Sequence, residues 1–348
     1  GIAARATVLG EKVSFSSSLS SVCVSLADST VRVSGRSFGC AVFGVAIVAI
    51  GPTDVRMLDS SFMVAEATNT TFTVDTPSGA ASILSIVVRT QTESTLEFVN
   101  SHLGILSGDH LSLSIIESSP QSLTAILSIS VMTPVRTDNS SLLVHNSSIS
   151  AFLSRSSLSV LAREDSAAIL SIGIRCVTGD AVTSVVVRES RIVFEGDYTT
   201  ITAYAVKMGS FIASVFSVVA NSDPASPPVH QLLDSSEISI IGSHLIFDAL
   251  ADSHGSGVLA MVVLGYACSS RGILTNAQLS LVASNNVTLK SRGDHGVATV
   301  GVTVGHALTS ELICNNSKIG AVGGNSNLIA VTDLYGGAIV GIATYHAT

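Results

Sequence analysis

Five asparagines stand in Asn-x-Ser/Thr sequences, the acceptor sequence for N-linked glycans in secreted proteins. They are Asn69, Asn139, Asn146, Asn286 and Asn315. Ser and Thr are abundant enough for several such sequences to arise by chance. The spacing of neighbouring apolar residues nevertheless puts Asn69 and Asn139 between strands and Asn286 at an outward position. We therefore predict these five residues as candidate glycosylation sites.

Two Asp-His pairs are the next candidates. Asp252-Ser-His254-Gly and Asp294-His295-Gly occupy similar loop positions in neighbouring repeats, where a metal ion or a carbohydrate could bind between loops. One His and one Asp per loop, without fixed spacing, is a weak pattern for a metal ligand set. Surface loop residues are the favoured interpretation, so we predict no metal site and no cofactor.

Enzymes that cleave polysaccharides on a β-helix need clustered carboxylates, with a basic partner or at glycosidase separation. The acidic residues nearest to clusters are Glu164-Asp165, Glu195 with Asp197, and Asp234 with Glu237. The repeats give none of them a basic partner in the adjacent repeat at the same register. A Gly-x-Ser-x-Gly elbow and glycine-rich nucleotide loops are also missing from the sequence. We predict no catalytic residues.

The composition indicates stacked strands. Hydrophobic residues make up 47% of the chain, aromatic residues only 5% and charged residues only 12%. Val, Ile, Ser and Thr dominate, which suits β-strands better than helices. A net charge of −8 argues against nucleic acid as a partner, and the apolar runs are too short to span a membrane.

A repeat of about 42 residues fills the chain. Its first marker is a small polar residue followed by two apolar residues spaced by two, with apolar residues also five and seven places before the pair. The marker begins at Ser29, Ser60, Ser101, Ser147, Ser190, Ser243, Asn285 and Ser317. Alternation on both sides of an odd offset predicts two short strands meeting at a corner, where the Ser or Asn side chain bonds to nearby backbone.

A second marker, with small residues before and within an apolar run, repeats in step with the first. It begins at Ala41, Ser82, Ala125, Ala168, Ser214, Ala260, Ala298 and Ala338. Two markers in step predict an all-β fold, a parallel β-helix or β-solenoid of about eight coils. Arrays of helical repeats of the HEAT or armadillo kind share the period but need helix formers and charged outer faces. A β-propeller is the stronger alternative, although the turn pairs of antiparallel hairpins are missing.

The predicted domain plan is a partial coil over 1–20 and one solenoid over 21–348, which could be a fragment of a longer array. Equivalent residues should stack into an interior column of Leu26, Met57, Phe98, Val144, Val187, Ile240, Val282 and Cys314. In that column Cys314 would be a buried, inert thiol. Cys23 and Cys40 share the first coil, and the sequence leaves open whether they pair.

The predicted outward positions between the paired apolar residues form no threonine ladder of the kind that ice binding would need. They are Arg32, Met63, Gly104, Ser150, Val193, Ile246, Thr288 and Gly320. Several of these residues are apolar, so part of the outer face could be covered by another strand, a glycan or a second subunit.

The repeated Ala-Ile-Leu-Ser-Ile segments and the Asn-Ser-Ser corners resemble the large repeat-rich surface proteins of kinetoplastid protozoa. The resemblance is to those of the dispersed gene family type, with pectate-lyase-like β-helices. The resemblance spans residues 21–348 and implies membrane-anchored display, adhesion and glycosylation. Passenger domains of bacterial autotransporters also look similar.

Three functions remain open after these observations. The favoured one is an extracellular or cell-surface structural protein, a coat or filament subunit that associates end to end with copies of itself or with neighbouring repeats of a longer chain. The alternative is an adhesin that binds a glycan or a protein on a lateral face. A polysaccharide-degrading enzyme is the least favoured.

Overall fold

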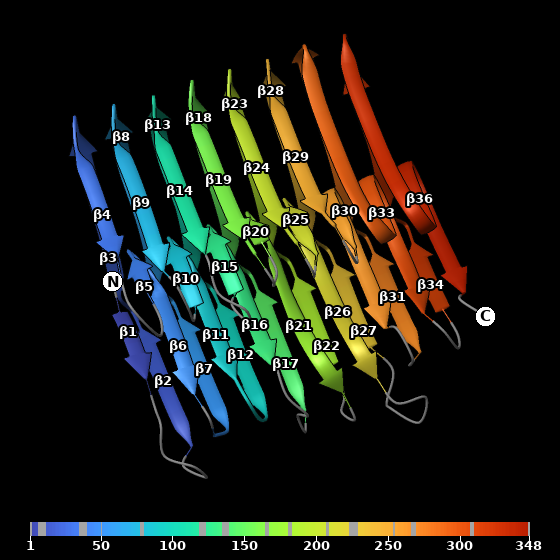
Figure 1. The fold of residues 1–348 in the computed structure, drawn as a ribbon, viewed down its shortest axis with the longest axis horizontal. Coiled ribbons are helices and arrows are strands. Elements are labelled where there is room, and N and C mark those ends of the chain that lie inside the picture. The colour runs from blue at the N-terminus through green and yellow to red at the C-terminus, as the bar shows by residue number, and fades with distance from the viewer. Residues whose placement is uncertain are drawn as a thin grey trace.

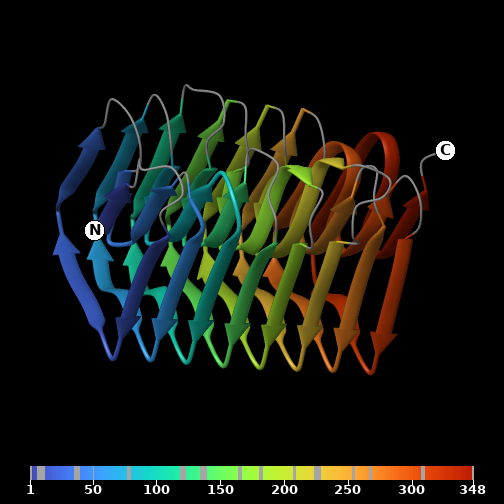
Figure 2. The same ribbon diagram turned by 90° about the horizontal axis from the view of Figure 1, so that it is seen from below.

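The computed structural model describes residues 2–5, 12–34, 40–49, 51–76, 80–117, 123–133, 139–163, 167–179, 183–206, 209–222, 229–252, 255–265, 269–306 and 310–346. Strands are the regular structure of these ranges, and every strand pairing in them is parallel. Figures 1 and 2 show the strands stacked side by side along the long axis, with one step of the stack for each turn of the chain. The chain is therefore a parallel β-solenoid, as the repeat predicts.

Three parallel sheets form the walls. The first sheet holds eight strands, β2 (Val13–Ser18), β7 (Thr53–Leu58), β12 (Ser94–Val99), β17 (Ser140–His145), β22 (Thr183–Arg188), β27 (Val229–Asp234), β31 (Ser270–Thr275) and β34 (Ser310–Asn315). The second sheet also holds eight, β3 (Ser21–Ala27), β8 (Ser61–Thr68), β13 (His102–Asp109), β18 (Ser148–Ser154), β23 (Arg191–Asp197), β28 (Glu237–Ser243), β32 (Gln278–Asn285) and β35 (Lys318–Gly323). β2 pairs with β7, so the boundary expected at residue 20 lies between two strands of one turn.

The largest sheet closes each turn. Its first row is β4 (Thr30–Ser34), β9 (Thr71–Thr76), β14 (Ser112–Glu117), β19 (Ser157–Ala162), β24 (Thr200–Ala205) and β29 (Ile246–Ala251). Two further rows are β5 (Cys40–Val42), β10 (Ala80–Ile83), β15 (Leu123–Ile126), β20 (Ala167–Ile169) and β25 (Ser210–Ile212), then β1 (Ile2–Arg5), β6 (Val45–Ala49), β11 (Ile86–Thr90), β16 (Ile129–Thr133), β21 (Ile172–Gly179) and β26 (Ser214–Ser222). Longer strands span two or all three rows, namely β30 (Ser256–Gly265), β33 (Val287–His306) and β36 (Ser326–His346).

Corners form where one residue adopts left-handed backbone angles. Between the first and second sheets this residue is Asp59 (φ 49°), Asn100 (φ 49°) or Asn146 (φ 46°) in successive turns. Asn and Asp tolerate these angles better than most residues. The serine that follows caps the bend: Oγ of Ser147 donates 2.7 Å to the carbonyl of His145 and accepts 3.0 Å from the N–H of Ser101, one turn earlier. The predicted side-chain-to-backbone bond at the corner is confirmed.

The interior is a continuous column of apolar side chains. Phe98 pairs in register with Met57 on one side and Val144 on the other, and all three are buried. The same column continues through Val187, Leu233 and Leu274 to Cys314. Burying such residues supplies most of the driving force for folding, roughly 25 cal/mol per Å² of apolar surface.

The predicted interior column is wrong at three positions. Leu26, Ile240 and Val282 belong to the second sheet, where they pair with Ala67, Phe194 and Ile241, and Val282 faces outward. The cause is that a second corner, between the second sheet and the largest sheet, repeats the same pattern a few residues later. Markers set at Ser29, Ser243 and Asn285 lie at that second corner, whereas those at Ser60, Ser101, Ser147, Ser190 and Ser317 precede the second sheet.

The second marker is displaced by three residues in two copies. The register pairs Ala168 with Phe211 and Gly257 with Ala298, so Phe211 and Gly257 hold the positions that the pattern assigned to Ser214 and Ala260. Ser214 instead pairs with Ala260, in the column that also contains Gly301. Phe211 is not a small residue, so the pattern of small residues does not reveal this position. The spacing between the true positions of the marker is more even than the spacing between the predicted ones.

Cys314 is not the buried thiol that the column predicts. It stands in register with buried Leu274, yet it is exposed because β34 is paired on one side only among the described strands. Partial burial still raises the pKa of its thiol. Cys23 is exposed, whereas Cys176 is buried with its sulfur 3.5 Å from the hydroxyl of Thr183. The side chain of Cys40 and the whole of Cys268 lie outside the described residues.

Candidate functional site

The five candidate glycosylation asparagines are all exposed. Asn69 and Asn286 are the left-handed residues of the corner after the second sheet, and Asn146 is that of the corner before it. Asn139 directly precedes β17, and Asn315 ends β34. The structure therefore puts every acceptor amide where a glycan would meet solvent, at three corners and two strand ends.

Corner amides form columns from turn to turn. Nδ2 of Asn146 donates 2.9 Å to Oδ1 of Asn100, and Nδ2 of Asn69 donates 3.0 Å to Oδ1 of Asp28. Asn316 donates to Asn276 in the same manner. Each amide retains a second N–H, so these bonds leave a position for a glycan at Asn69 and Asn146.

The predicted Asp-His pairs are not brought together by any described contact. His254 and the side chain of His295 lie outside the described residues, as do Glu164-Asp165. Within the ranges that the structure describes, no group of three or more His, Cys, Asp or Glu side chains could share a metal ion. Those ranges likewise hold no helix with the length and apolarity to cross a bilayer.

Charged residues do pair in register between turns. Arg191 lies directly opposite Glu237 at 3.8 Å, and Arg271 opposite Glu311 at 2.9 Å. The expectation that Glu237 lacks a basic partner in the adjacent repeat is thus wrong. The corrected alignment puts the two residues in one column at the start of β23 and β28. Exposed pairs of this kind each stabilise the fold by about 1 kcal/mol at most.

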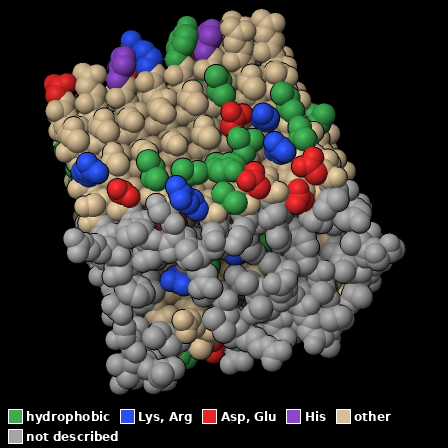
Figure 3. All heavy atoms as spheres, in the orientation of Figure 1, with side chains coloured by type: hydrophobic (Ala, Val, Ile, Leu, Met, Phe, Trp, Pro, Cys, Tyr) green, Lys and Arg blue, Asp and Glu red, His purple; other side chains and the backbone are tan. Residues whose placement is uncertain are grey.

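The outward side of β9, β14, β19 and β24 carries two columns of hydroxyl groups. One column runs through Thr71, Ser112, Ser157 and Thr200, and the other through Thr73, Ser114, Ser159 and Thr202. The predicted outward series missed these mixed Ser and Thr columns, because it combined positions from two different sheets. Figure 3 shows this face as largely uncharged. Arg32 ends the second column on one side and Asp248 on the other.

A groove on the second sheet is lined by both apolar and polar side chains. Its volume is about 470 Å³, and its walls come from β13, β18, β23, β28 and β32. Such a volume is within the roughly 300–1,000 Å³ that ligand clefts usually have. The groove runs along the solenoid axis, across the turns rather than along a strand.

Three glycines and Leu153 make the floor of this groove. Gly108 pairs with Leu153, Leu153 with Gly196, and Gly196 with Gly242. A Cβ at Gly196 would stand 1.9 Å from the carbonyl oxygen of Leu153, so only glycine allows this close approach of the turns. The register also shifts within β13, between Ile105 and Gly108. A bulge of this kind locally bends the strand that carries it, here β13.

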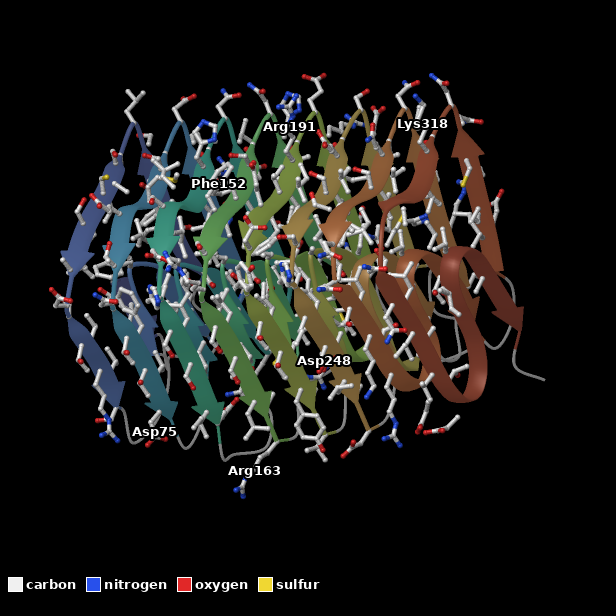
Figure 4. The ribbon with its side chains drawn as sticks, turned by 90° about the horizontal axis from the view of Figure 1, so that it is seen from above. Asp75, Phe152, Arg163, Arg191, Asp248 and Lys318 are labelled. Atoms are coloured by element: carbon white, nitrogen blue, oxygen red, sulfur yellow. The ribbon has the colours of Figure 1, made fainter. Side chains whose placement is uncertain are left out.

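The two banks of the groove differ in chemistry. One bank is the outward column of Leu106, Phe152, Glu195 and Ile241, which is apolar except for Glu195. The other bank is Asp109, Ser154 and Asp197, beside the corner. Figure 4 shows Phe152 on the second sheet, on the side of the molecule where Arg191 also lies.

The polar bank is held by short-range contacts. Oδ1 of Asp197 accepts 2.9 Å from the N–H of Ser243 and also bonds to the hydroxyl of Ser243. Arg155 donates two bonds of 3.1 Å to Asp109. Desolvation alone would raise the pKa of Asp109, but the hydrogen bond from His110 and the charge of Arg155 outweigh it and lower that pKa.

An aromatic pair stands at the corner beside this bank. The rings of Tyr198 and His244 stack with centroids 4.3 Å apart and an interplanar angle of 10°. Tyr198 directly follows Asp197 in the chain, and His244 follows Ser243. Glu195 and Asp197 stand out in the sequence as neighbouring acidic residues, but the apolar bank was not predicted. The available signal was glycine at matching places in successive repeats, Gly196 and Gly242.

Within the part of the chain that the structure describes, the groove and the face with the two hydroxyl columns are lateral surfaces on which a ligand could lie. No protein-family model matches the chain, and no curated protein and no solved structure matches it. The features from which a function can be proposed are therefore those of the molecule itself.

Proposed function

We propose that the chain is a structural repeat protein of the extracellular space or cell surface, serving as a coat or filament subunit. The single observation that carries this proposal is the unbroken register of the first sheet, from β2 to β34. Phe98, for example, stacks between Met57 and Val144. The corner serines Ser101 and Ser147 each accept a hydrogen bond from a backbone N–H of the preceding turn. A stack of this kind is stiff along its axis, which is the property that a coat or filament needs.

The last described strands offer a surface for end-to-end association. β34, β35 and β36 are paired on one side only among the described strands, and Val322, Ile339 and Ile342 are exposed on them. An unpaired parallel edge accepts another strand readily. A second copy of the chain, or further repeats of a longer chain, would continue the same ladder.

Light scattering coupled to size-exclusion chromatography tests this association for the 348-residue chain, with negative-stain images of the particles. We expect a mass that rises with concentration and particles elongated along one axis. Replacing both Val322 and Ile342 with Lys should abolish the rise, because charge on an edge opposes pairing. Thr202→Lys, which adds charge on a lateral face, should leave it intact. A monodisperse monomer at every concentration would contradict the proposal.

Surface display with glycosylation is part of this proposal. The exposure of all five sequon asparagines and the likeness to repeat-rich surface proteins support it. Expression in a eukaryotic secretory host, followed by enzymatic deglycosylation and mass spectrometry, measures occupancy. We expect at least two occupied sites, and a mass unchanged by deglycosylation would count against display of this kind.

A second candidate function is adhesion through a lateral face. The observation that favours it is the groove on the second sheet, with one apolar bank and one polar bank. A rigid solenoid would hold such a groove at a fixed orientation from the surface that carries it.

A further inference from the structure

We propose that the groove on the second sheet binds an uncharged, linear oligosaccharide lying along the solenoid axis. The inference deepens the second candidate function, adhesion through a lateral face, by naming the site and the class of ligand. It does not depend on whether the chain also forms filaments.

The shape of the groove favours an extended ligand. The walls come from five successive strands of the second sheet, each roughly 4.8 Å from the next along the axis. Gly196 and Gly242 line the hollow without side chains, and both positions require glycine because a Cβ there would collide with the backbone of the preceding turn.

The arrangement of the two banks matches a sugar ring. A pyranose has apolar C–H faces and hydroxyl groups at its edges. Phe152 and Ile241 offer apolar contact on one bank, and the carboxylates of Glu195 and Asp197 accept hydrogen bonds from hydroxyl groups. The stacked Tyr198 ring, 60% exposed at the adjacent corner, extends the aromatic surface.

The charges select against acidic glycans. Glu195 makes no ion pair with any described residue, whereas the charge of Asp109 is offset by Arg155. Glu195 and Asp197, which have no cationic partner among the residues that the structure describes, would repel sulfate or uronate groups. An uncharged chain satisfies the same oxygen acceptors without that repulsion.

A peptide strand is the weaker occupant. Peptides commonly bind sheets by adding a strand at a free edge, but the groove crosses the middle of the second sheet. There the backbone N–H and C=O groups of β18, β23 and β28 are already used by the parallel ladder. A peptide in the groove would be left with side-chain contacts alone.

Calorimetric titration of the intact chain with cellohexaose, mannohexaose and laminarihexaose tests the proposal, with a heparin hexasaccharide and a Lys-rich peptide as the competing ligands. We expect at least one uncharged hexasaccharide to bind with saturation and the heparin fragment not to bind. Phe152→Ala and Glu195→Gln should each weaken that binding about tenfold or more. Thr202→Ala, on the neighbouring face, should leave the Kd unchanged.

Two results would overturn the assignment. Saturable binding of the Lys-rich peptide or of heparin, with no binding of the uncharged sugars, would give the groove a different class of ligand. Sugar binding that survives both groove variants would put the site elsewhere on the molecule. Circular dichroism of each variant verifies that the β-solenoid is intact. Neither result bears on filament formation, which the scattering experiment tests separately.

Discussion

The backbone N–H of Ser171 donates a hydrogen bond of 3.1 Å to Oγ of Ser128, its counterpart one turn earlier. The same Oγ donates 2.9 Å to the carbonyl of Ile126, and the N–H of Ser128 bonds in turn to Oγ of Ser85. All three serines are fully buried. Serine therefore serves at these bends as a link between turns, with its hydroxyl both donating and accepting.

Ser128→Ala should destabilise the solenoid by about 1–3 kcal/mol, because it leaves the buried N–H of Ser171 without its acceptor. Hydrogen exchange measures this directly as faster exchange of the Ser171 amide, and urea unfolding gives the change in stability. Ser159→Ala, on the outward face of β19, is the control and should stay within about 0.5 kcal/mol of the parent. Equal effects of both substitutions would show that the link between turns is unimportant.

Gly196→Ala should destabilise the groove strands strongly, by about 1–3 kcal/mol or more. The new Cβ would meet the carbonyl oxygen of Leu153 at 1.9 Å, and backbone cannot move aside as a flexible side chain can. Gly320→Ala is the matched control on the same sheet, because a Cβ there meets nothing within 4 Å. Thermal unfolding of the two variants compares them, and a Gly196→Ala midpoint equal to that of Gly320→Ala would contradict the close approach.

Leu274→Ala should cost about 2–5 kcal/mol, whereas Cys314→Ala should cost far less. Both residues stand in one interior column, but Leu274 is fully buried and Cys314 is exposed. Urea unfolding of the two variants measures the difference. Similar losses would mean that Cys314 is covered in solution, as it would be in an end-to-end assembly.

Thiol labelling should modify Cys23 and Cys314 in the native protein and spare Cys176 until the chain unfolds. Cys176 is 1% exposed, and its sulfur lies 3.5 Å from the hydroxyl of Thr183. Because burial raises the pKa of Cys314, its labelling rate should rise steeply as the solution becomes alkaline. Mass spectrometry of labelled peptides identifies the sites, and rapid native labelling of Cys176 would contradict its position.

Acid should weaken the groove bank through Asp109. Its pKa in the folded state is lowered below the unfolded value of about 3.9, so its contribution to stability is complete above that value. The contribution is lost as the pH falls through the lower, folded-state pKa. Asp109→Asn should therefore lose less stability than the parent between about pH 5 and pH 2. Thermal unfolding across that range measures it, with Asp248→Asn as the control.

Much of the fold could be predicted from the residues, since Val, Ile and Leu at alternate positions point inward in every turn. The exact register could not be predicted, because the corners before and after the second sheet are formed in the same way. Asn146 and Asn69 both adopt left-handed angles, and a polar residue of similar size follows each. The local sequence pattern does not distinguish two such corners. The strand pairing does distinguish them, because Val187 pairs with Leu233 and not with Ile240.

The groove was harder to predict than the walls. Glu195 and Asp197 stood out in the sequence as neighbouring acids, but Phe152 and Ile241 read as ordinary apolar residues of a strand. The two reach one bank only through pairing with Glu195 from either side. A site built across turns leaves no continuous motif in the chain.

Strand pairing restricted to the preceding and following turns has a consequence for how this protein can change over generations. Removing or duplicating one complete repeat outside the groove strands, for instance around Val55 and Leu96, joins residues that already occupy equivalent positions. Unequal recombination between copies of the repeat would thus alter the length of the molecule while leaving its cross-section intact. The length of the solenoid can therefore change between generations without a change in the ligand that the groove binds.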